Sequence, residues 1–238
     1  MRHISVIAWH HCAWLMLWFF YDTNDMTIKT FWRNPYQTIL TSTVASVYGA
    51  DITLLETIFF AFSGGQESDH GTIAGWPVLA AKKQGREIVY TLADKHGLAV
   101  GQLVQIEIDW HRRYRLMRLH FAAELVLELV CKTLVGVDKV GAHIAQEKAR
   151  IDFAWPESIA PLLPQIEAQV NAIIGADLAI RTAFDDEPNE RRYWEVEGIA
   201  RVPCGGTHVR STGEVGALRL KRTNKGRGNE RVEIYLSD

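Results

Sequence analysis

The sequence predicts an α+β protein in which a small antiparallel β-barrel is followed by an α+β domain. Residues 29–110 contain short runs rich in Thr, Val and Ile, and glycine-rich turns separate them. From Arg113 onward, apolar residues recur at helical spacing, and further strand-like runs then alternate with a second helical segment. This change near Trp110 predicts a β-barrel domain over 26–110 and an α+β domain over 111–238.

The first domain is predicted to consist of short strands. Partial alternation and β-branched residues predict strands over 38–48 and 52–62. A turn-rich loop from Ser63 to Gly71 follows them. Further strands are expected at 72–79, 87–92 and 104–109. Several short strands at this spacing are typical of a small barrel.

The second domain is predicted to begin with a long helix over 114–134, because no glycine or proline interrupts the segment before Gly136. A second helix is expected over 159–174, where Pro161 and Pro164 lie near its start. The remaining strand-like runs are residues 149–153, 195–202, 215–222 and 231–236. Helices and strands are therefore mixed in this half.

Residues 1–25 form an apolar leader that is set apart from the fold prediction. Ile4 to Tyr21 is almost wholly apolar and about long enough to span a membrane. His10 and His11 lie in its middle, which a spanning helix tolerates poorly. Three interpretations stay open: a mis-assigned translation start before Met26, an anchor or signal segment, and a packed helix.

Composition narrows the class of protein. The chain has 238 residues and a formal net charge of −2, so nucleic-acid binding requires a local basic face. Cys12, Cys131 and Cys204 are odd in number and far apart, which argues against a disulfide framework. A reducing compartment, and so a cytoplasmic location, is expected.

Four residues stand out as candidate metal ligands. His120 and Glu124 are one helical turn apart, so both side chains project from one face of the predicted helix. Cys204 and His208 have the same spacing, but the glycines between them indicate a tight loop. Nitrogen, oxygen and thiolate donors together suit Zn²⁺. Spacing alone is weak support, because single histidines and cysteines are usually structural.

An ordered set of motifs gives a more specific indication. The run Cys204 to His208 resembles the CGGTH motif of the AlaX family, the free-standing relatives of the alanyl-tRNA synthetase editing domain. Matching segments lie in the family's order at 63–71, 109–118, 141–153 and 212–216. The resemblance runs from about Met26 to the C-terminus.

The resemblance implies fold, activity and partners. It implies an editing domain like the second additional domain of threonyl- and alanyl-tRNA synthetases. It also implies a zinc-dependent deacylase that removes serine or glycine from wrongly charged tRNA for alanine, with one Zn²⁺ per chain. No stable protein partner is expected, and no membrane association unless residues 1–25 form an anchor.

One departure from the family pattern concerns the predicted helix. The family carries HxxxH there, whereas this chain has His120 and then Glu124. Glu124 could ligate zinc through oxygen. Alternatively, His120, Cys204 and His208 form a three-ligand site and Glu124 acts as a general base. A third possibility is that the site holds no metal.

Other residues are candidates for handling the substrate. Thr207 is a candidate catalytic group, and Gly205 and Gly206 could supply main-chain N–H groups to the oxyanion that develops during ester hydrolysis. Gln146 matches a glutamine of the family's editing pocket, and Gln66 lies in the glycine-rich loop. A pocket that hydrogen-bonds the serine hydroxyl would reject alanine.

The tRNA itself is expected to contact basic residues at two places. Arg112 and Arg113 open the first helix. The second place is a glycine-broken basic hairpin near the C-terminus, whose candidates are Lys221, Arg222, Lys225 and Arg227.

Three other classes compete with the deacylase. The first is a tRNA-binding relative that kept the fold and lost the metal, and its main support is Glu124. A complete synthetase is not expected, because 238 residues are too few for an ATP-dependent core beside these two domains and contain no GxxxxGK[ST] loop. The absence of HExxH argues against a zinc protease.

Overall fold

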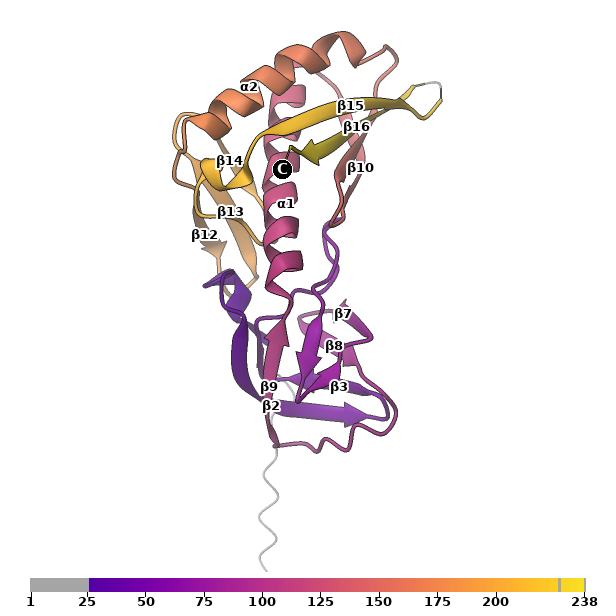
Figure 1. Ribbon diagram of the computed structural model, residues 1–238, viewed down its shortest axis with the longest axis vertical. Helices are drawn as coiled ribbons and strands as arrows, with labels where there is room; N and C mark the ends of the chain where they lie inside the picture. Colours follow the sequence, from indigo (N-terminus) through magenta and orange to yellow (C-terminus); the bar gives the residue numbers. More distant parts are fainter. Residues whose placement is uncertain (1–25, 227, 238) are drawn as a thin grey trace, which may run out of the picture.

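A computed structural model describes residues 26–237 with the exception of Arg227. The predictions for residues 1–25 and for Arg227 therefore lie outside the described part. Two bodies are stacked along the long axis of the molecule, with the N-terminal half below the C-terminal half in Figure 1. Across the described residues, no helix has the length and apolar character needed to cross a membrane.

The N-terminal half contains a curled antiparallel sheet of seven strands in the order β6-β5-β9-β2-β3-β8-β7. Its strands are β2 (Ile39–Tyr48), β3 (Asp51–Leu54), β5 (Gly71–Ile73), β6 (Trp76–Pro77), β7 (Ala80–Gln84), β8 (Glu87–Thr91) and β9 (Leu103–Ile108). Strand β2 pairs with β9 through its first half and with β3 through its second, and the register shifts between Val44 and Ser46. Because such a bulge increases twist, the sheet curls around its core.

The predicted barrel thus takes the form of a curled sheet whose edge strands are β6 and β7. Beside it, the short strands β1 (Ile28–Lys29) and β4 (Glu56–Thr57) pair in parallel. The short 3₁₀ helix η1 (Thr30–Trp32) follows β1 and lies next to the C-terminal half.

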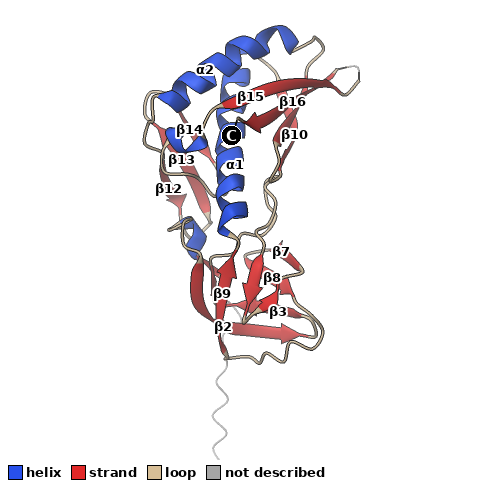
Figure 2. Ribbon diagram, viewed as in Figure 1, coloured by secondary structure: helices blue, strands red, loops and turns tan. Residues whose placement is uncertain are grey.

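The helix α1 (Trp110–Thr133) is the central element of the C-terminal half. It begins four residues before the predicted start, because the Asp109 side chain accepts a hydrogen bond from the Arg112 N–H and caps the helix at Trp110. Figure 2 shows strands on both sides of this helix, which is why apolar residues such as Leu119 and Val126 are fully buried.

Two antiparallel sheets flank α1. One has the order β10-β11-β16-β15, with β10 (Asp138–Ile144), β11 (Ala149–Ala154), β15 (Leu218–Asn224) and β16 (Asn229–Leu236). The other is β12-β13-β14, with β12 (Arg181–Asp186), β13 (Arg191–Val196) and β14 (Ala200–Pro203). Helix α2 (Leu163–Gly175) packs on α1 and β15, with η2 (Ala160–Leu162) before it and η3 (Thr212–Val215) nearby.

These elements confirm the α+β class and correct several of the predicted strands. The predicted strand 195–202 is two strands, β13 and β14, joined by a turn at Gly198, which has φ +74°. The predicted strand 72–79 is likewise two strands, β5 and β6. The sequence did not predict β1, β7, β10 or β12. The division of the chain into two domains near Trp110 stays a prediction.

Candidate functional site

Helix α1 and the loop after β14 bring the four predicted ligands together. His120 Nε2 lies 3.2 Å from Cys204 Sγ, and the rings of His120 and His208 are 5.0 Å apart at their centroids. One ligand atom from each of His120, Cys204 and His208 lies within 4.8 Å of the others. Cys204 and His208 lie 84 and 88 positions after His120 in the chain, yet the three residues form one compact cluster of donors.

The unpaired nitrogens of this cluster fit a metal ion. Both ring nitrogens of His208 and Nδ1 of His120 are buried without a hydrogen-bond partner among the described residues. Burying such groups unpaired is costly, and a neutral imidazole has one nitrogen with a free lone pair, so a metal ion that binds this nitrogen of His208 would offset part of the cost. Burial lowers the pKa of His120 and lowers that of His208 well below its usual value, which keeps both rings neutral at pH 7.

The Cys204 thiol is protonated when no metal is present. Burial, with Glu124 nearby, raises the pKa of this thiol to about 12. A zinc ion favours the thiolate, which is its ligand form. The set of two imidazoles and one thiol therefore fits a Zn²⁺ site of the catalytic type, which keeps one position open.

Glu124 points into the same cluster. Its Oε1 lies 3.6 Å from His120 Nε2 and 3.8 Å from Cys204 Sγ. Its Oε2 accepts a hydrogen bond of 3.2 Å from the indole N–H of Trp194, which is fully buried. One carboxylate oxygen is thereby anchored and the other faces the donors, a geometry compatible with a ligand and with a general base.

The glycines of the loop have distinct roles. A Cβ at Gly206 would lie 2.4 Å from Cε1 of His120, so the main chain passes directly over the imidazole and only glycine fits. At Gly205 the corresponding space is open. Among the described residues, the Gly205 N–H has no hydrogen-bond partner, whereas the Gly206 N–H points to Cys204 Sγ at 3.5 Å.

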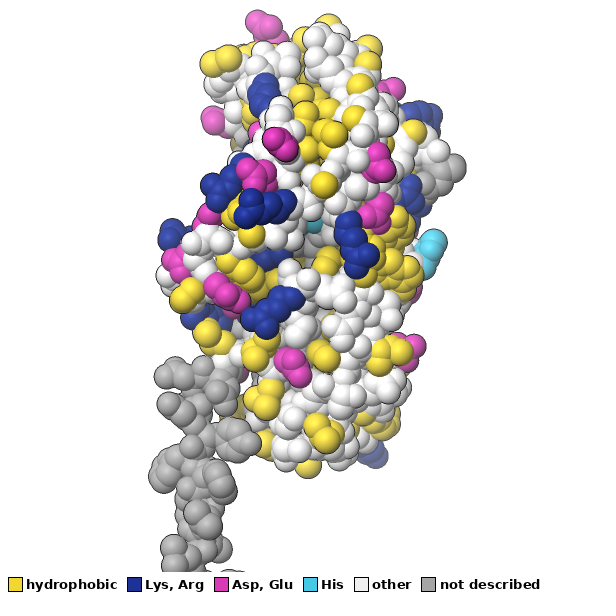
Figure 3. All heavy atoms as spheres, turned by 90° about the vertical axis from the view of Figure 1, so that its left-hand side faces the viewer, with side chains coloured by type: hydrophobic (Ala, Val, Ile, Leu, Met, Phe, Trp, Pro, Cys, Tyr) yellow, Lys and Arg dark blue, Asp and Glu magenta, His cyan; other side chains and the backbone are white. Residues whose placement is uncertain are grey.

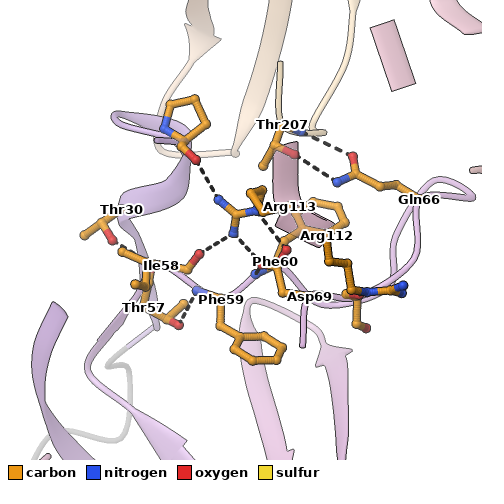
Figure 4. A network of polar contacts seen from close by, with 12 residues as sticks. Thr30, Thr57, Ile58, Phe59, Phe60, Gln66, Asp69, Arg112, Arg113 and Thr207 are labelled. Carbon is orange, nitrogen blue, oxygen red and sulfur yellow. Dashed lines mark hydrogen bonds and ion pairs between the residues drawn. The ribbon is translucent and has the colours of Figure 1, made fainter. Parts of the chain in front are cut away.

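Gln66 and Thr207 bind each other. Gln66 Nε2 donates to Thr207 Oγ1 at 2.9 Å, and Gln66 Oε1 accepts from the Thr207 N–H at 3.4 Å. Both residues are buried. This pair connects the glycine-rich loop of the N-terminal half to the loop that carries the metal donors (Figure 4).

Arg113 forms the other polar connection in Figure 4. Its guanidinium forms an ion pair with Asp69, in which both side chains are fully buried, and it also donates to the carbonyls of Pro35 and Ile58. Asp69 Oδ2 in turn accepts from the Phe60 N–H at 2.6 Å. Arg113, expected to contact tRNA, is instead enclosed between the two halves of the protein, where no phosphate reaches it.

Arg112 is also turned inward. It donates to the Ser68 carbonyl at 3.0 Å, to Gln146 Oε1 at 3.2 Å and to Glu67 Oε2 at 2.7 Å. Only 7% of Arg112 is exposed. Gln146, predicted to bind substrate, therefore lies on the glycine-rich loop side of α1, held by Arg112 rather than by the metal donors.

The basic residues of the predicted hairpin differ in exposure. Lys221 and Lys225 are exposed, as a phosphate contact requires. Arg222 instead pairs through Nε and Nη2 with Glu230 at 2.5 and 2.6 Å. Figure 3 shows a face of the molecule on which basic and acidic side chains are intermixed.

Sequence reasoning missed residues that support the site from outside the motifs. Trp194 anchors Glu124, and Trp32 and Arg192 bind the carbonyls of Gly205 and Gly206. An alternating pattern in β13 predicts that Arg192 and Trp194 share a face, but it cannot say what they meet there.

Comparisons with known proteins match most of the chain. Residues 195–233 match the family described as threonyl and alanyl tRNA synthetase second additional domain. An alanyl-tRNA editing protein AlaX-M of Pyrococcus horikoshii is 33% identical over 217 residues, which cover 89% of this chain and 99% of that protein. The AlaX-M protein of Methanosarcina mazei is 28% identical, over 90% and 98% of the two chains.

The same residues resemble part of a larger enzyme. An alanine–tRNA ligase of Staphylothermus marinus is 32% identical over 226 residues, which cover 85% of this chain but only 25% of the ligase. The similarity thus extends over nearly the whole length of the free-standing editing proteins and over one segment of the ligase.

Proposed function

Because this chain belongs to the AlaX family of alanyl-tRNA editing proteins, we propose that it hydrolyses the ester of tRNA for alanine wrongly charged with serine or glycine, in a reaction that depends on zinc. The chain is an aminoacyl-tRNA deacylase. The observation that carries the proposal of zinc is the cluster of His120, Cys204 and His208, in which both His208 nitrogens are buried and unpaired.

The residues of the site divide the chemical work among them. Zinc held by His120, Cys204 and His208 would supply Lewis-acid polarisation of the ester. Oε1 of Glu124, which faces the donors while Trp194 holds Oε2, is placed to take a proton from an attacking water. The Gly205 N–H, which has no hydrogen-bond partner in the described part of the chain, could donate to the developing oxyanion.

Discrimination between serine and alanine is assigned to Thr207. Its Oγ1 already accepts from Gln66, so its own hydroxyl proton stays available for a polar group of the substrate. A site that hydrogen-bonds the serine hydroxyl leaves a buried group unpaired when alanine is bound. Gln66 then fixes the direction of the Thr207 hydroxyl.

We also propose that the protein is located in the cytoplasm.

The test is single-turnover deacylation of Ser-tRNA, Gly-tRNA and Ala-tRNA for alanine, with the zinc content measured on the same preparation. We expect rapid loss of serine or glycine, slow loss of alanine, and about one zinc per chain. Cys204→Ser should abolish both zinc binding and deacylation. Cys131→Ser, at an exposed cysteine of the same protein, is the matched control.

The alternative is a metal-free tRNA-binding relative, which Glu124 in place of the family's histidine favours. Retention of every amino acid on the tRNA, together with no zinc and intact tRNA binding, would establish that alternative. Zinc bound without deacylation would also refute the proposed activity.

A further inference from the structure

Two side chains outside the motifs hold the loop that carries the metal donors. The indole N–H of Trp32 donates to the Gly205 carbonyl at 2.8 Å. The guanidinium of Arg192 donates through Nη1 to the Gly206 carbonyl at 3.3 Å and through Nη2 to the Trp32 carbonyl at 2.9 Å. Trp32 belongs to the N-terminal half and Arg192 to β13 of the C-terminal half, so residues of both halves donate hydrogen bonds to this loop.

The geometry of the peptide bond gives these contacts a consequence. In a planar trans peptide, the C=O and N–H groups point in opposite directions. Trp32 holds the carbonyl of the peptide between Gly205 and Gly206, so the N–H of that peptide faces Cys204 Sγ. Arg192 holds the carbonyl of the next peptide, so the Thr207 N–H faces Gln66 Oε1.

Arg192 is unusual as a structural residue. Only 5% of it is exposed, its Nε has no partner, and no acidic side chain among the described residues forms an ion pair with it. Its guanidinium carbon lies 5.5 Å from the Trp32 ring and 5.3 Å from the Phe184 ring. Burying an unpaired cation is costly, so its retention here calls for a role at the neighbouring site.

We propose that Arg192 and Trp32 are positioning residues of the deacylase site: they fix the two peptide planes that aim Cys204 at the metal and Thr207 at Gln66. The inference rests on the proposed function. The backbone carbonyl of Arg192 also accepts from the Cys204 N–H at 2.9 Å, which ties the ligand itself to β13.

The test compares four variants with the wild-type protein. Arg192→Met removes the hydrogen bonds from Arg192 to the Gly206 and Trp32 carbonyls, and Arg192→Lys keeps the charge without the planar guanidinium. Trp32→Phe removes the indole N–H and keeps an aromatic ring. Arg191→Met is the matched control, because Arg191 is the exposed neighbour of Arg192 on β13. Zinc affinity is measured by chelator competition, and kcat and KM by deacylation of Ser-tRNA.

We expect Arg192→Met to weaken zinc binding by about 10- to 100-fold, as loss of residues that orient metal ligands does. Its kcat should fall by at least about tenfold while KM changes less than about twofold, because only the loop from Cys204 to His208 loses support. Trp32→Phe should lower kcat by about three- to tenfold. Arg192→Lys should recover only part of the loss, and Arg191→Met should match the wild-type protein.

Folded Arg192→Met and Trp32→Phe proteins with wild-type zinc affinity and kcat would overturn the proposal. If Arg192→Met does not fold, Trp32→Phe decides, since it changes a single donor. If the wild-type protein deacylates nothing, the proposed function fails, but the zinc affinities of the variants still test whether Arg192 and Trp32 position the metal donors. If it also binds no zinc, the rate of Cys204 alkylation by iodoacetamide, read by mass spectrometry, should rise in Trp32→Phe, which keeps the charge of Arg192 beside the thiol. An unchanged rate in that variant would refute the positioning role.

Discussion

At position 124, α1 carries a carboxylate where the family pattern has a second histidine. A carboxylate brings a negative charge to a cluster that already holds a potential thiolate, Cys204, at 3.8 Å. The hydrogen bond from Trp194 fixes one oxygen, so the other cannot swing out of the site without breaking that bond. Position 124 is therefore still part of the site, but it contributes a carboxylate instead of an imidazole.

Glu124→Gln separates the two roles open to this residue. The amide keeps an acceptor for Trp194 but can neither remove a proton nor bind zinc well. We expect kcat to fall by about 100-fold, within the range for loss of a general base. An unchanged zinc affinity would identify Glu124 as the base, and a weakened one as a ligand. Glu128→Gln, one turn along α1, is the control, and full activity in Glu124→Gln would exclude both roles.

Thr207→Val tests the assignment of substrate discrimination. Valine matches the shape of threonine but leaves Gln66 Nε2 buried without its acceptor, a loss of about 1–3 kcal/mol of stability. If Thr207 binds the serine hydroxyl, deacylation of Ser-tRNA should fall more than that of Ala-tRNA, and their ratio of kcat/KM should shrink. Equal loss for both substrates would limit Thr207 to holding the loop.

At the scale of elements, β15 places its two predicted tRNA-binding residues on opposite faces. Lys221→Met should weaken tRNA binding and lower the slope of log K against log salt by about one. Arg222→Met should leave tRNA binding unchanged and destabilise the fold, because Glu230 loses its partner. Filter binding at several salt concentrations and urea unfolding measure the two effects. Equal tRNA-binding losses in both variants would contradict this division.

The same pair predicts a dependence on pH. The hydrogen bonds from Arg222 hold the pKa of Glu230 below its usual value. The stability that this supplies is complete above the unfolded-state pKa of about 4.3 and is lost as pH falls toward the folded-state value. The difference in unfolding free energy between wild-type protein and Arg222→Met should therefore shrink between about pH 5 and pH 3.

Elements with a strong pattern could be predicted from the sequence, and weakly patterned ones could not. The apolar repeat of α1 is long and uninterrupted, so the helix was found and only its capped start was missed. Strand β12 is polar and exposed at a sheet edge, and β10 contains a register shift next to Gly141. Neither has the alternation by which strands are recognised.

The metal donors were predictable for a related reason. His120 and Glu124 lie within one helix, and Cys204 and His208 within one motif, so local spacing indicates each pair. Sequence could not indicate that Arg112 and Arg113 turn inward. Their partners Glu67 and Asp69 lie about 45 positions earlier, and contacts between distant segments leave no local pattern.

At the scale of the whole molecule, the N-terminal half forms part of the site. Gln66 reaches Thr207 across 141 positions of the chain, and its loop is secured by the buried pair of Asp69 and Arg113. A buried ion pair is weak support for net stability, but removal of one partner leaves the other charge uncompensated. The pair should thus act as a lock: it should hold the loop of Gln66 in place, and so keep Gln66 in contact with Thr207 in the loop from Cys204 to His208.

Asp69→Asn and Arg113→Met test that lock. Each single variant should lose about 3–5 kcal/mol of unfolding free energy, because a buried charge is left without its partner. The double variant should lose less than the sum, since it leaves no isolated charge. Arg33→Met is the matched control: Arg33 also bridges the two halves through Glu187, but both side chains are mostly exposed, and its loss should cost less than about 1 kcal/mol. Urea unfolding measures the four variants against the wild-type protein. Additive losses would show that Asp69 and Arg113 stabilise the two halves separately rather than as one pair.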